Sequence, residues 1–465
     1  MALTLTFSGG AETVTGSNFL VEGPKGKLLV DCGIEQGKDF CQECMYAPFP
    51  YDVPSVNAVV ITHAHLDHIG RLPKLMREGF KGKIYMTAPT KDLTQLILDD
   101  SARIMAEDAR EKGLPLLYDE RDVLAAMALV EIVDYHVEWE AAPGLSCILR
   151  NTGHILGSAS VRIRDLSDGP DGVTLALTGD IGNSPSPYLP DPEAIPDADV
   201  MVMESVYGDR LHTHVSERVD ELQKALGAAI ARGGTILIPA FSLERTQLML
   251  YEMSNLMEAG KLPKIPVFLD SPLAIKATDV YRKWAEKFFK DAVKDELHRE
   301  HDIFNFPFLT ETLTREESEK IASAPSPKII MAGAGMSHGG RIGRWEQLYL
   351  PDPTTTLFIV GYQAPGSPGR LLQDGATSVR LGGKAVSIRA QIQSFTGWSA
   401  HADRDGLLAF AKMTLPRTKT IFTALGEPSA SRFLAQRIHD YLGVKAIVPT
   451  EGQKWQITKD GVREI

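Results

Sequence analysis

Six consecutive residues of this chain carry three imidazoles and one carboxylate, in the order His63-Ala-His65-Leu-Asp67-His68. The apolar run over residues 58–61 comes just before them and predicts a buried parallel strand. Open α/β sheets place their ligand sites at the carboxyl ends of such strands. Imidazole nitrogens and carboxylate oxygens are ligands that zinc prefers, so this spacing predicts a metal site rather than a solvated loop. We therefore expect a metallohydrolase.

Length and charge bound the architecture further. With 465 residues, the chain is too long for one ordinary hydrophobic core, so two domains are expected. Lysine and arginine total 49 against 60 aspartate and glutamate residues, which leaves a net charge of −11. Proteins that bind nucleic acid over a broad surface are usually basic. Any contact with RNA or DNA must therefore come from a local group of cationic side chains.

Several signals favour the cytoplasm and exclude a membrane partner. No stretch reaches the roughly 18 uninterrupted apolar residues of a membrane span, and residues 1–10 lack the basic and apolar regions of a signal peptide. The four cysteines are too few for a disulfide framework in a chain of this length. Cys41 and Cys44 form a lone CxxC motif, which we interpret as two ordinary thiols, with a redox pair or half a metal site as the alternatives.

The spacing of apolar residues changes near residue 208. Before it, short strands and turns dominate, with one long helix expected over residues 91–112. After it, helices alternate with strands, which is typical of a parallel, Rossmann-like sheet, and Ser216 is the expected N-cap of the first helix. A strand–helix–strand unit over residues 420–448 is expected to close the chain. Other expected strands include residues 3–8, 18–22, 27–31, 56–62, 145–151, 173–178, 199–204, 235–239, 267–270, 328–331 and 356–360.

Three further donor residues stand at the ends of expected strands. Asp31 closes the strand over residues 27–31, His154 follows residues 145–151, and Asp180 follows residues 173–178. Taken singly, each is more often a cap or a turn residue than a metal ligand. Their joint occurrence with the histidine cluster predicts one metal centre built from several strand ends.

This set of residues resembles the metal motifs of the metallo-β-lactamase fold. Three later stretches resemble the β-CASP branch of that fold, which contains RNA-processing nucleases such as RNase J and the endonuclease of pre-mRNA cleavage. They are Glu204-Ser-Val-Tyr-Gly-Asp, Asp270-Ser-Pro-Leu-Ala and Ser394-Phe-Thr-Gly-Trp-Ser-Ala-His401. The resemblance implies an α/β architecture, an αββα sandwich over residues 1–207 and 396–465 with a Rossmann-like β-CASP domain inserted at residues 208–395.

The resemblance also implies roles for the site residues. Asp180 would bridge two zinc ions, and Asp31 would orient a ligand imidazole from behind. Glu204 would polarise His401, which would act as the general acid; without the resemblance, His401 is equally well explained as the neighbour of a helix cap. The first zinc would be held by His63, His65 and His154, and the second by Asp67 and His68. The catalytic set would be Asp67, His401, Glu204 and Asp31.

The chemistry of phosphodiester hydrolysis agrees with these roles. The reaction needs a nucleophile near neutral pH, neutralisation of charge on the phosphoryl oxygens, and a proton for the leaving oxygen. Two metals about 3.5–4 Å apart supply the first two. A histidine suits the third, because its proton is transferable near pH 7.

One position departs from the family pattern. Family members carry a histidine before the Gly-Glu of the last motif, where it binds the second metal, but this chain has Leu425 before Gly426 and Glu427. A leucine side chain offers no lone pair, so the second position would keep three protein ligands, a number that catalytic zinc sites accept. We expect one tight zinc site and a second, weaker one, with manganese as an alternative metal.

Cationic side chains around a glycine-rich turn are the candidates for contact with the substrate. Residues 333–341 follow an expected strand and suit a close approach of the backbone to an anion. Arg341 and Arg370 are the predicted substrate-binding residues, with Arg344 as a further candidate. For each of them, a surface salt bridge is the alternative.

The sequence thus predicts a metal-dependent ribonuclease that acts on single-stranded RNA. One alternative is a hydrolase of small esters, lactones or thioesters with the same fold. The β-CASP insertion and the pair Glu204–His401 argue against it, since relatives with small substrates need neither. The other alternative is an RNA-binding or scaffolding protein with weakened catalysis, because of Leu425. A homodimer is also left open.

Overall fold

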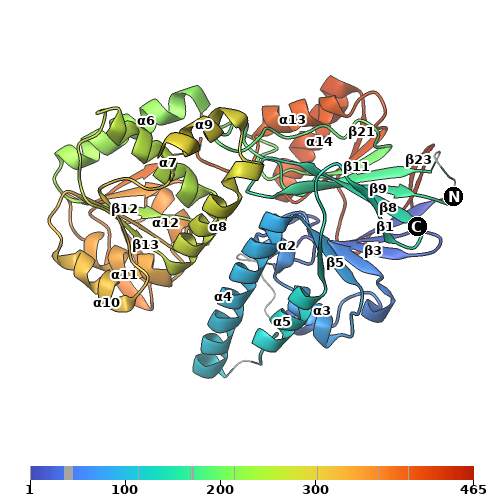
Figure 1. Ribbon diagram of the computed structural model, residues 1–465, viewed down its shortest axis with the longest axis horizontal. Coiled ribbons are helices and arrows are strands. Elements are labelled where there is room, and N and C mark those ends of the chain that lie inside the picture. Colours follow the sequence, from blue (N-terminus) through green and yellow to red (C-terminus); the bar gives the residue numbers. More distant parts are fainter. Residues whose placement is uncertain are drawn as a thin grey trace. The chain divides into compact units, whose positions relative to one another are not determined.

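The computed structural model describes residues 2–35, 45–113, 115–167, 169, 172–213, 215–300, 302–364, 366–395 and 397–465. The chain forms two compact units (Figure 1), Met1–Leu211 with His401–Ile465, and His212–Ala400. The sequence had suggested boundaries at 207/208 and 395/396. Cys41 and Cys44, interpreted as two ordinary thiols, lie outside the described residues. Cys32 and Cys147 are buried free thiols.

Two β-sheets pack face to face in the first unit (Figure 1). Apolar side chains of both sheets form one core between them, for example Phe7 from one sheet and Val161 from the other. In spatial order the first sheet contains β23 (Gly461–Glu464), β22 (Lys454–Thr458), β1 (Leu3–Phe7), β2 (Phe19–Glu22), β3 (Lys27–Val30), β4 (Ala58–Val60), β5 (Lys83–Met86) and β6 (Val130–Ile132). The second contains β21 (Lys445–Ile447), β20 (Thr420–Ala424), β11 (Val200–Glu204), β10 (Thr174–Leu177), β9 (Ala159–Asp165), β8 (Leu145–Asn151) and β7 (Glu138–Ala142).

Helices cover the outer faces of both sheets. On the first sheet, Leu72 and Leu98 pack against Val59 and their neighbours. On the second sheet, Phe410 and Leu434 share a core with residues of β11. This order of layers confirms the predicted αββα sandwich. The covering helices are α3 (Leu72–Arg77), α4 (Ala88–Lys112) and α5 (Glu120–Ala128) on one side, and α13 (Arg404–Met413) and α14 (Pro428–Leu442) on the other.

The second unit contains a six-stranded sheet in which every pairing is parallel. This confirms the predicted Rossmann-like sheet. The strands, in spatial order, are β14 (Leu309–Glu311), β13 (Val267–Asp270), β15 (Lys328–Ala332), β12 (Thr235–Pro239), β16 (Thr356–Ile359) and β19 (Gln391–Ser394). The helices are α6 (Val215–Ala231), α7 (Arg245–Glu258), α8 (Pro272–Phe288), α9 (Asp291–Glu300), α10 (Arg315–Lys320), α11 (Gly340–Tyr349) and α12 (Pro368–Gln373), with a hairpin of β17 (Ser378–Leu381) and β18 (Lys384–Ser387).

Several helices begin earlier than the sequence suggested. α4 begins at Ala88 instead of residue 91, because the Thr87 side chain caps it by accepting from the Thr90 N–H. α6 begins at Val215, so the prediction of Ser216 as its N-cap was wrong. None of the helices built from the described residues has both the length and the apolar character that crossing a bilayer requires.

The prediction that a strand–helix–strand unit closes the chain was also wrong. The hairpin of β22 and β23 follows that unit, and β22 pairs antiparallel with β1, opposite Leu3 to Thr6. Trp455 and Ile457 point into the core between the two sheets, which explains why the segment joins this edge. The alternation of these two apolar residues with polar ones was the signal for the strand.

Candidate metal centre

The predicted histidine cluster lies directly after β4. His63 and His65 occupy the connection that follows this strand, and the short helix α2 (Leu66–Ile69) carries Asp67 and His68. His63 and His68 are fully buried. The strand end therefore presents the four side chains together, as the sequence predicted.

The backbone around this cluster is fixed by the segment before β2 and by the segment that follows β3. The Cys32 N–H donates to the carbonyl of His68 at 2.8 Å, and the Ser17 N–H donates to that of Asp67 at 2.9 Å. Gly33 lies so close that a Cβ on it would stand 1.5 Å from the carbonyl oxygen of Asp67. Only glycine allows this approach, which holds α2 and its two ligand candidates against the sheet.

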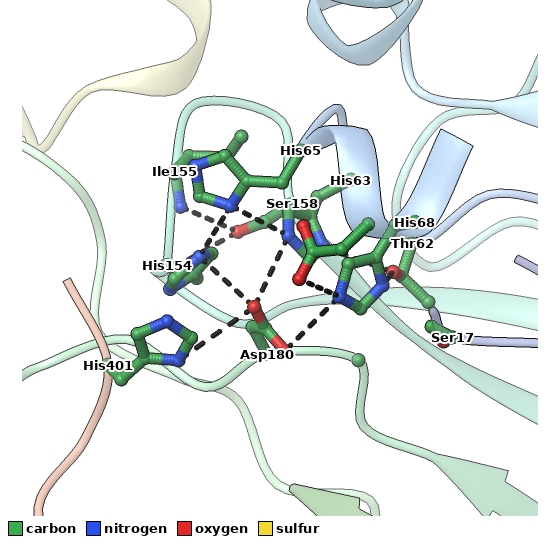
Figure 2. A network of polar contacts seen from close by, with 12 residues as sticks. Ser17, Thr62, His63, His65, His68, His154, Ile155, Ser158, Asp180 and His401 are labelled. Carbon is green, nitrogen blue, oxygen red and sulfur yellow. Dashed lines mark hydrogen bonds and ion pairs between the residues drawn. The ribbon is translucent and has the colours of Figure 1, made fainter. Parts of the chain in front are cut away.

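Four ligand atoms converge in a first group (Figure 2). His65 Nδ1 lies 3.0 Å from His63 Nε2 and 3.1 Å from His154 Nε2. Asp180 Oδ2 lies 3.4 Å from the same Nε2 atoms of His63 and His154. A tetrahedral zinc with ligand bonds of about 2.0–2.1 Å has ligand–ligand edges of about 3.3–3.4 Å. The donor types and their spacing therefore fit a zinc ion.

A second group surrounds His68. Its Nε2 lies 3.5 Å from Asp180 Oδ1 and 4.0 Å from Asp67 Oδ2. This buried nitrogen has no hydrogen-bond partner among the described residues, which is unusual for a buried polar atom. Asp180 thus presents one oxygen to each group, and an unsatisfied nitrogen in a carboxylate environment fits a second metal ion.

Asp31 contacts the nitrogen of His68 that faces away from Asp180. The family resemblance predicted a carboxylate that orients a ligand imidazole in this way. Its Oδ2 lies 2.7 Å from His68 Nδ1 and accepts hydrogen bonds from the hydroxyls of Ser17 and Thr62 at 3.0 and 2.9 Å. Its φ of 60° is uncommon for a residue other than glycine, although aspartate tolerates it better than most. The contact at Nδ1 leaves the opposite nitrogen of His68 to face Asp180.

A serine organises the turn that carries His154. The Ser158 hydroxyl accepts hydrogen bonds from the backbone N–H groups of His154 and Ile155 at 3.1 and 3.3 Å (Figure 2). Thr152 donates its own hydroxyl to the same oxygen at 2.9 Å. The connection between β8 and β9 is therefore closed around Ser158, which holds the His154 imidazole toward His65.

Glu204 and His401 come together at the edge of the first group. Glu204 ends β11 and is fully buried, and both of its carboxylate oxygens lie 3.3–3.4 Å from His401 Nδ1. The same nitrogen lies 3.8 Å from Asp180 Oδ2, the oxygen that faces the three histidines. This contact puts His401 beside the first group, and Asp180, Glu204 and His401 together form a further group of possible ligand atoms.

Burial and neighbouring charges act in opposite directions on these groups. Burial lowers the pKa of His63 and takes that of His154 well below its ordinary value. Burial also disfavours the charged form of His68, but Asp180 and Asp31 outweigh it and raise this pKa well above the ordinary value. His63 and His154 are therefore neutral near pH 7, which is the metal-binding form. Around His68 the carboxylates favour a positive charge, whether a proton or a metal.

Leu425, the residue that departs from the family pattern, follows β20 and is buried in the core between the sheets. Its backbone N–H donates to the carbonyl of Gly10 at 2.7 Å. A Cβ on Gly10 would lie 2.8 Å from the Leu425 Cδ2, so the side chain packs closely on that backbone. This strand end contributes an alkyl group where the family contributes an imidazole.

The predicted substrate-binding arginines lie in the second unit, and both form ion pairs. Arg341 donates to Asp270 Oδ1 at 2.6 Å and to the backbone carbonyls of Thr312 and Leu313. Arg370 pairs with Asp374 through its Nε at 3.0 Å, and its side chain is 38% exposed. The salt bridge that the sequence left as the alternative is thus present for both, and a role in binding RNA stays a prediction.

Glu346 is a buried carboxyl next to the glycine-rich turn. Its Oε1 accepts a hydrogen bond from the Ser337 hydroxyl at 2.6 Å, and its Oε2 has no partner among the described residues. Burial raises the pKa of Glu346 to about 7, against the opposing effect of the Ser337 hydrogen bond. The folded chain therefore keeps a proton on Glu346 at a pH where the unfolded chain has released it.

We expect this difference to appear in the pH dependence of stability. A folded pKa near 7 stabilises the chain at low pH, and the stabilisation is lost as pH rises from about 4.5 to about 7, at a cost of about 2–3 kcal/mol. Glu346→Gln removes the titration, so its free energy of unfolding should fall by that much less between pH 5 and pH 8. Urea denaturation at both pH values measures the difference. An unchanged pH dependence in the variant would contradict the raised pKa.

Sequence reasoning missed the hydroxyl groups that hold the centre in place. Thr62, Ser17 and Ser158 each contact a ligand candidate or Asp31, as described above. For Thr62 a signal existed, because it stands between the strand and the first histidine. For Ser17 and Ser158 the sequence offered none, since serine is common in turns and its partners become visible only in three dimensions.

Two groups of histidine and aspartate side chains that share Asp180, at the strand ends of an αββα sandwich, are the candidate ligands of a metallohydrolase. Comparison with family models agrees. The metallo-β-lactamase superfamily matches residues 12–240, the β-CASP domain matches residues 246–372, and the RNA specificity domain of zinc-dependent metallo-hydrolases matches residues 385–449. The chain belongs to the metallo-β-lactamase superfamily, in its β-CASP branch, which confirms the resemblance drawn from the motifs.

Similar proteins span nearly the whole chain. Ribonuclease TTHA0252 of Thermus thermophilus is 36% identical over 86% of this chain and 88% of its own length. Transcription termination factor FttA of Methanosarcina mazei is 30% identical over 95% of this chain and 69% of its own length. An RNase J-like protein of Methanocaldococcus jannaschii is 31% identical, covering 96% and 98%. A crystal structure of an Enterococcus faecalis protein of unknown function shares the fold at 11% identity, with a TM-score of 0.53 and 98% of this chain covered.

Proposed function

We propose that this chain is a metal-dependent ribonuclease that hydrolyses phosphodiester bonds of single-stranded RNA. The observation that carries the proposal is the contact of His401 with Asp180, the carboxylate shared by both ligand groups. A proton donor thus stands next to the position where the metals would act. The relative named as a ribonuclease and the matched RNA specificity domain support RNA as the substrate.

The donor sets fit divalent metals, with zinc as the proposed ion and manganese as the alternative. The first ion would be held by His63, His65, His154 and Asp180, and the second by Asp67, His68 and Asp180. Bound there, the two ions would supply a nucleophile from water near neutral pH and neutralise charge on the phosphoryl oxygens. Asp31 would keep the His68 ring in place through its contact at Nδ1.

His401 would provide the proton for the leaving oxygen of the RNA. Its Nδ1 faces the Glu204 carboxylate, so this pair favours the tautomer with a proton on Nδ1. The His401 side chain is 12% exposed, in contrast to the fully buried Glu204, so the ring can be reached from solvent. Glu204 then acts by holding the ring and its tautomer, and His401 by transferring a proton.

Substrate contacts, cellular location and oligomeric state are the remaining points. Arg341 and Arg370 would contact RNA phosphates with the N–H groups that their ion pairs leave available. The cytoplasm is the proposed location. A homodimer stays a prediction, which light scattering of the purified chain would test.

Two measurements on the purified chain test the function. Metal analysis should find bound zinc, and single-stranded RNA labelled at the 5′ or the 3′ end should be cleaved in a metal-dependent way. A nitrophenyl ester serves as the competing substrate. Ester hydrolysis with intact RNA would favour a small-ester hydrolase, and RNA binding without cleavage would favour a scaffolding protein; either result would overturn the proposal.

Leu425 leads to a prediction about the two metal positions. We expect near-stoichiometric binding at the three-histidine position, formed by His63, His65, His154 and Asp180, and weaker binding at the second position, formed by the second group. Added metal should therefore raise activity until the second position is saturated. Groups that only hydrogen-bond to a metal ligand already raise metal affinity by about 10- to 100-fold. A new ligand in Leu425→His should therefore raise the metal affinity of the second position by at least about tenfold. Isothermal titration with zinc measures both affinities.

Leu425→Met is the control for this prediction, because it conserves the volume of the side chain and adds no nitrogen donor. It should leave the affinity of the second position unchanged. Two equally tight metals in the unmodified chain would contradict the prediction and would require a donor not considered above.

A further inference from the structure

One buried hydroxyl lies between the two ligand groups. Thr62 is 1% exposed, and its Oγ1 lies 3.1 Å from His63 Nδ1 and 3.3 Å from His68 Nδ1. These are imidazoles of different groups, His63 in the first and His68 in the second (Figure 2). The same hydroxyl lies 2.9 Å from Asp31 Oδ2.

The directions of these hydrogen bonds follow from the number of protons available. His63 turns its Nε2 toward His65 and Asp180, so a metal there requires the proton of the neutral ring on Nδ1. That Nδ1–H needs an acceptor, and Thr62 Oγ1 is in reach. The hydroxyl has one proton of its own, which the Asp31 carboxylate accepts. His68 Nδ1 donates directly to the same carboxylate.

Packing holds the hydroxyl in this position. The Thr62 N–H donates to Asp31 Oδ1 at 2.8 Å, and its carbonyl accepts from the Ala159 N–H at 2.8 Å. On the remaining side stands Gly179, where a Cβ would lie 2.7 Å from the Cβ and 2.8 Å from the Oγ1 of Thr62. Gly179 directly precedes the shared ligand Asp180, so Thr62 also packs against the strand end that presents it.

We propose that Thr62 is a positioning residue whose hydroxyl links Asp31 to His63 through two hydrogen bonds. This relay fixes the proton of His63 on Nδ1 and thereby couples the two metal positions. Asp31 then orients one ligand of each position, His68 directly and His63 through the Thr62 hydroxyl. This inference rests on the metal centre of the proposed function, but it concerns metal binding and does not depend on the substrate being RNA.

The test compares Thr62→Val, which keeps the shape and loses the hydroxyl, with Thr62→Ser, which keeps the hydroxyl. Zinc affinity is measured by competition with a chelator, and cobalt(II) absorption reports the geometry of the first position. Thr62→Val should lose about 10- to 100-fold in affinity at the three-histidine position, as expected for an orienting partner. Thr62→Ser should stay within a few-fold of the unmodified chain.

Ser17→Ala is the matched control. Ser17 donates to the same Asp31 oxygen as Thr62, but none of its described contacts is with an imidazole. Its loss should therefore change the cobalt(II) spectrum far less than Thr62→Val does. Thr62→Ala, which also lacks the hydroxyl, replaces Thr62→Val if the latter does not fold by circular dichroism.

The outcomes separate this inference from the proposed function. Metal affinity in Thr62→Val or Thr62→Ala equal to that of the unmodified chain would overturn the relay, even if RNA is cleaved. An equal loss in Thr62→Ser would overturn it as well, because shape and not the hydroxyl would then matter. A chain that binds metal with the expected ranking of variants but leaves RNA intact would support the relay and refute the ribonuclease.

Discussion

A His63→Ala/His65→Ala variant is expected to lose most of its bound metal and all cleavage of RNA above background. These residues supply two of the four atoms of the first group, at 3.0 Å from one another. Zinc cannot complete its preferred four ligands from His154 and Asp180 alone. The measurement is metal content after dialysis, together with cleavage of labelled single-stranded RNA at saturating added metal.

The chain provides a matched control with two other histidines. His136 and His298 are exposed and form surface ion pairs with Glu193 and Glu286. A His136→Ala/His298→Ala variant should therefore keep both its metal and its activity. Full metal occupancy in the His63→Ala/His65→Ala variant would refute the assignment of the first group.

The second large effect is expected at His401. His401→Ala should lower the turnover of RNA by about 10²–10⁴-fold, the usual contribution of one positioned proton donor. Its metal content should stay unchanged, because the ligands proposed for both ions come from other residues, although Asp180, Glu204 and His401 also form a group of possible ligand atoms. Glu204→Gln should act in the same direction with a smaller effect, since Glu204 acts on the reaction through the Nδ1 of His401; its carboxylate also accepts a hydrogen bond from the Ile181 N–H.

Metal analysis decides between two roles for His401. If His401→Ala loses metal along with activity, His401 is a ligand that takes the place of the missing histidine, and the acid role is wrong.

Much of the candidate site could be predicted from the sequence, because the sequence predicts where strands end. The apolar strand before His63, and the strands before His154 and Asp180, predict their own carboxyl ends. In the fold these ends come from both sheets, β4 from the first and β8 and β10 from the second, and they meet at the candidate metal centre. The spacing of the histidines then identified the metal chemistry, and the family pattern added His401, which no local feature marks.

What the sequence concealed depends on contacts between distant segments. Ser17 and Asp31 belong to different connections, and Thr62 lies 117 residues before Gly179 on the numbering of the chain. The spacing of apolar residues along the chain cannot predict contacts between such distant residues. The hairpin of β22 and β23 escaped for a similar reason, because its partner β1 stands at the other end of the chain. For Arg341 the sequence left a salt bridge open but could not show that Asp270 is the partner.

The second unit is inserted into the sequence of the first, and this order affects when the chain becomes active during its synthesis. The ligand groups end with Asp180, but His401 and the strand β20 come only after the whole unit His212–Ala400. A ribosome adds about 5–20 residues per second, so on the order of 10–40 s separate Asp180 from His401. Until then a nascent chain would hold the candidate metal ligands without the proposed proton donor. A ribonuclease of this architecture would thus remain inactive beside the messenger that encodes it for most of its own translation.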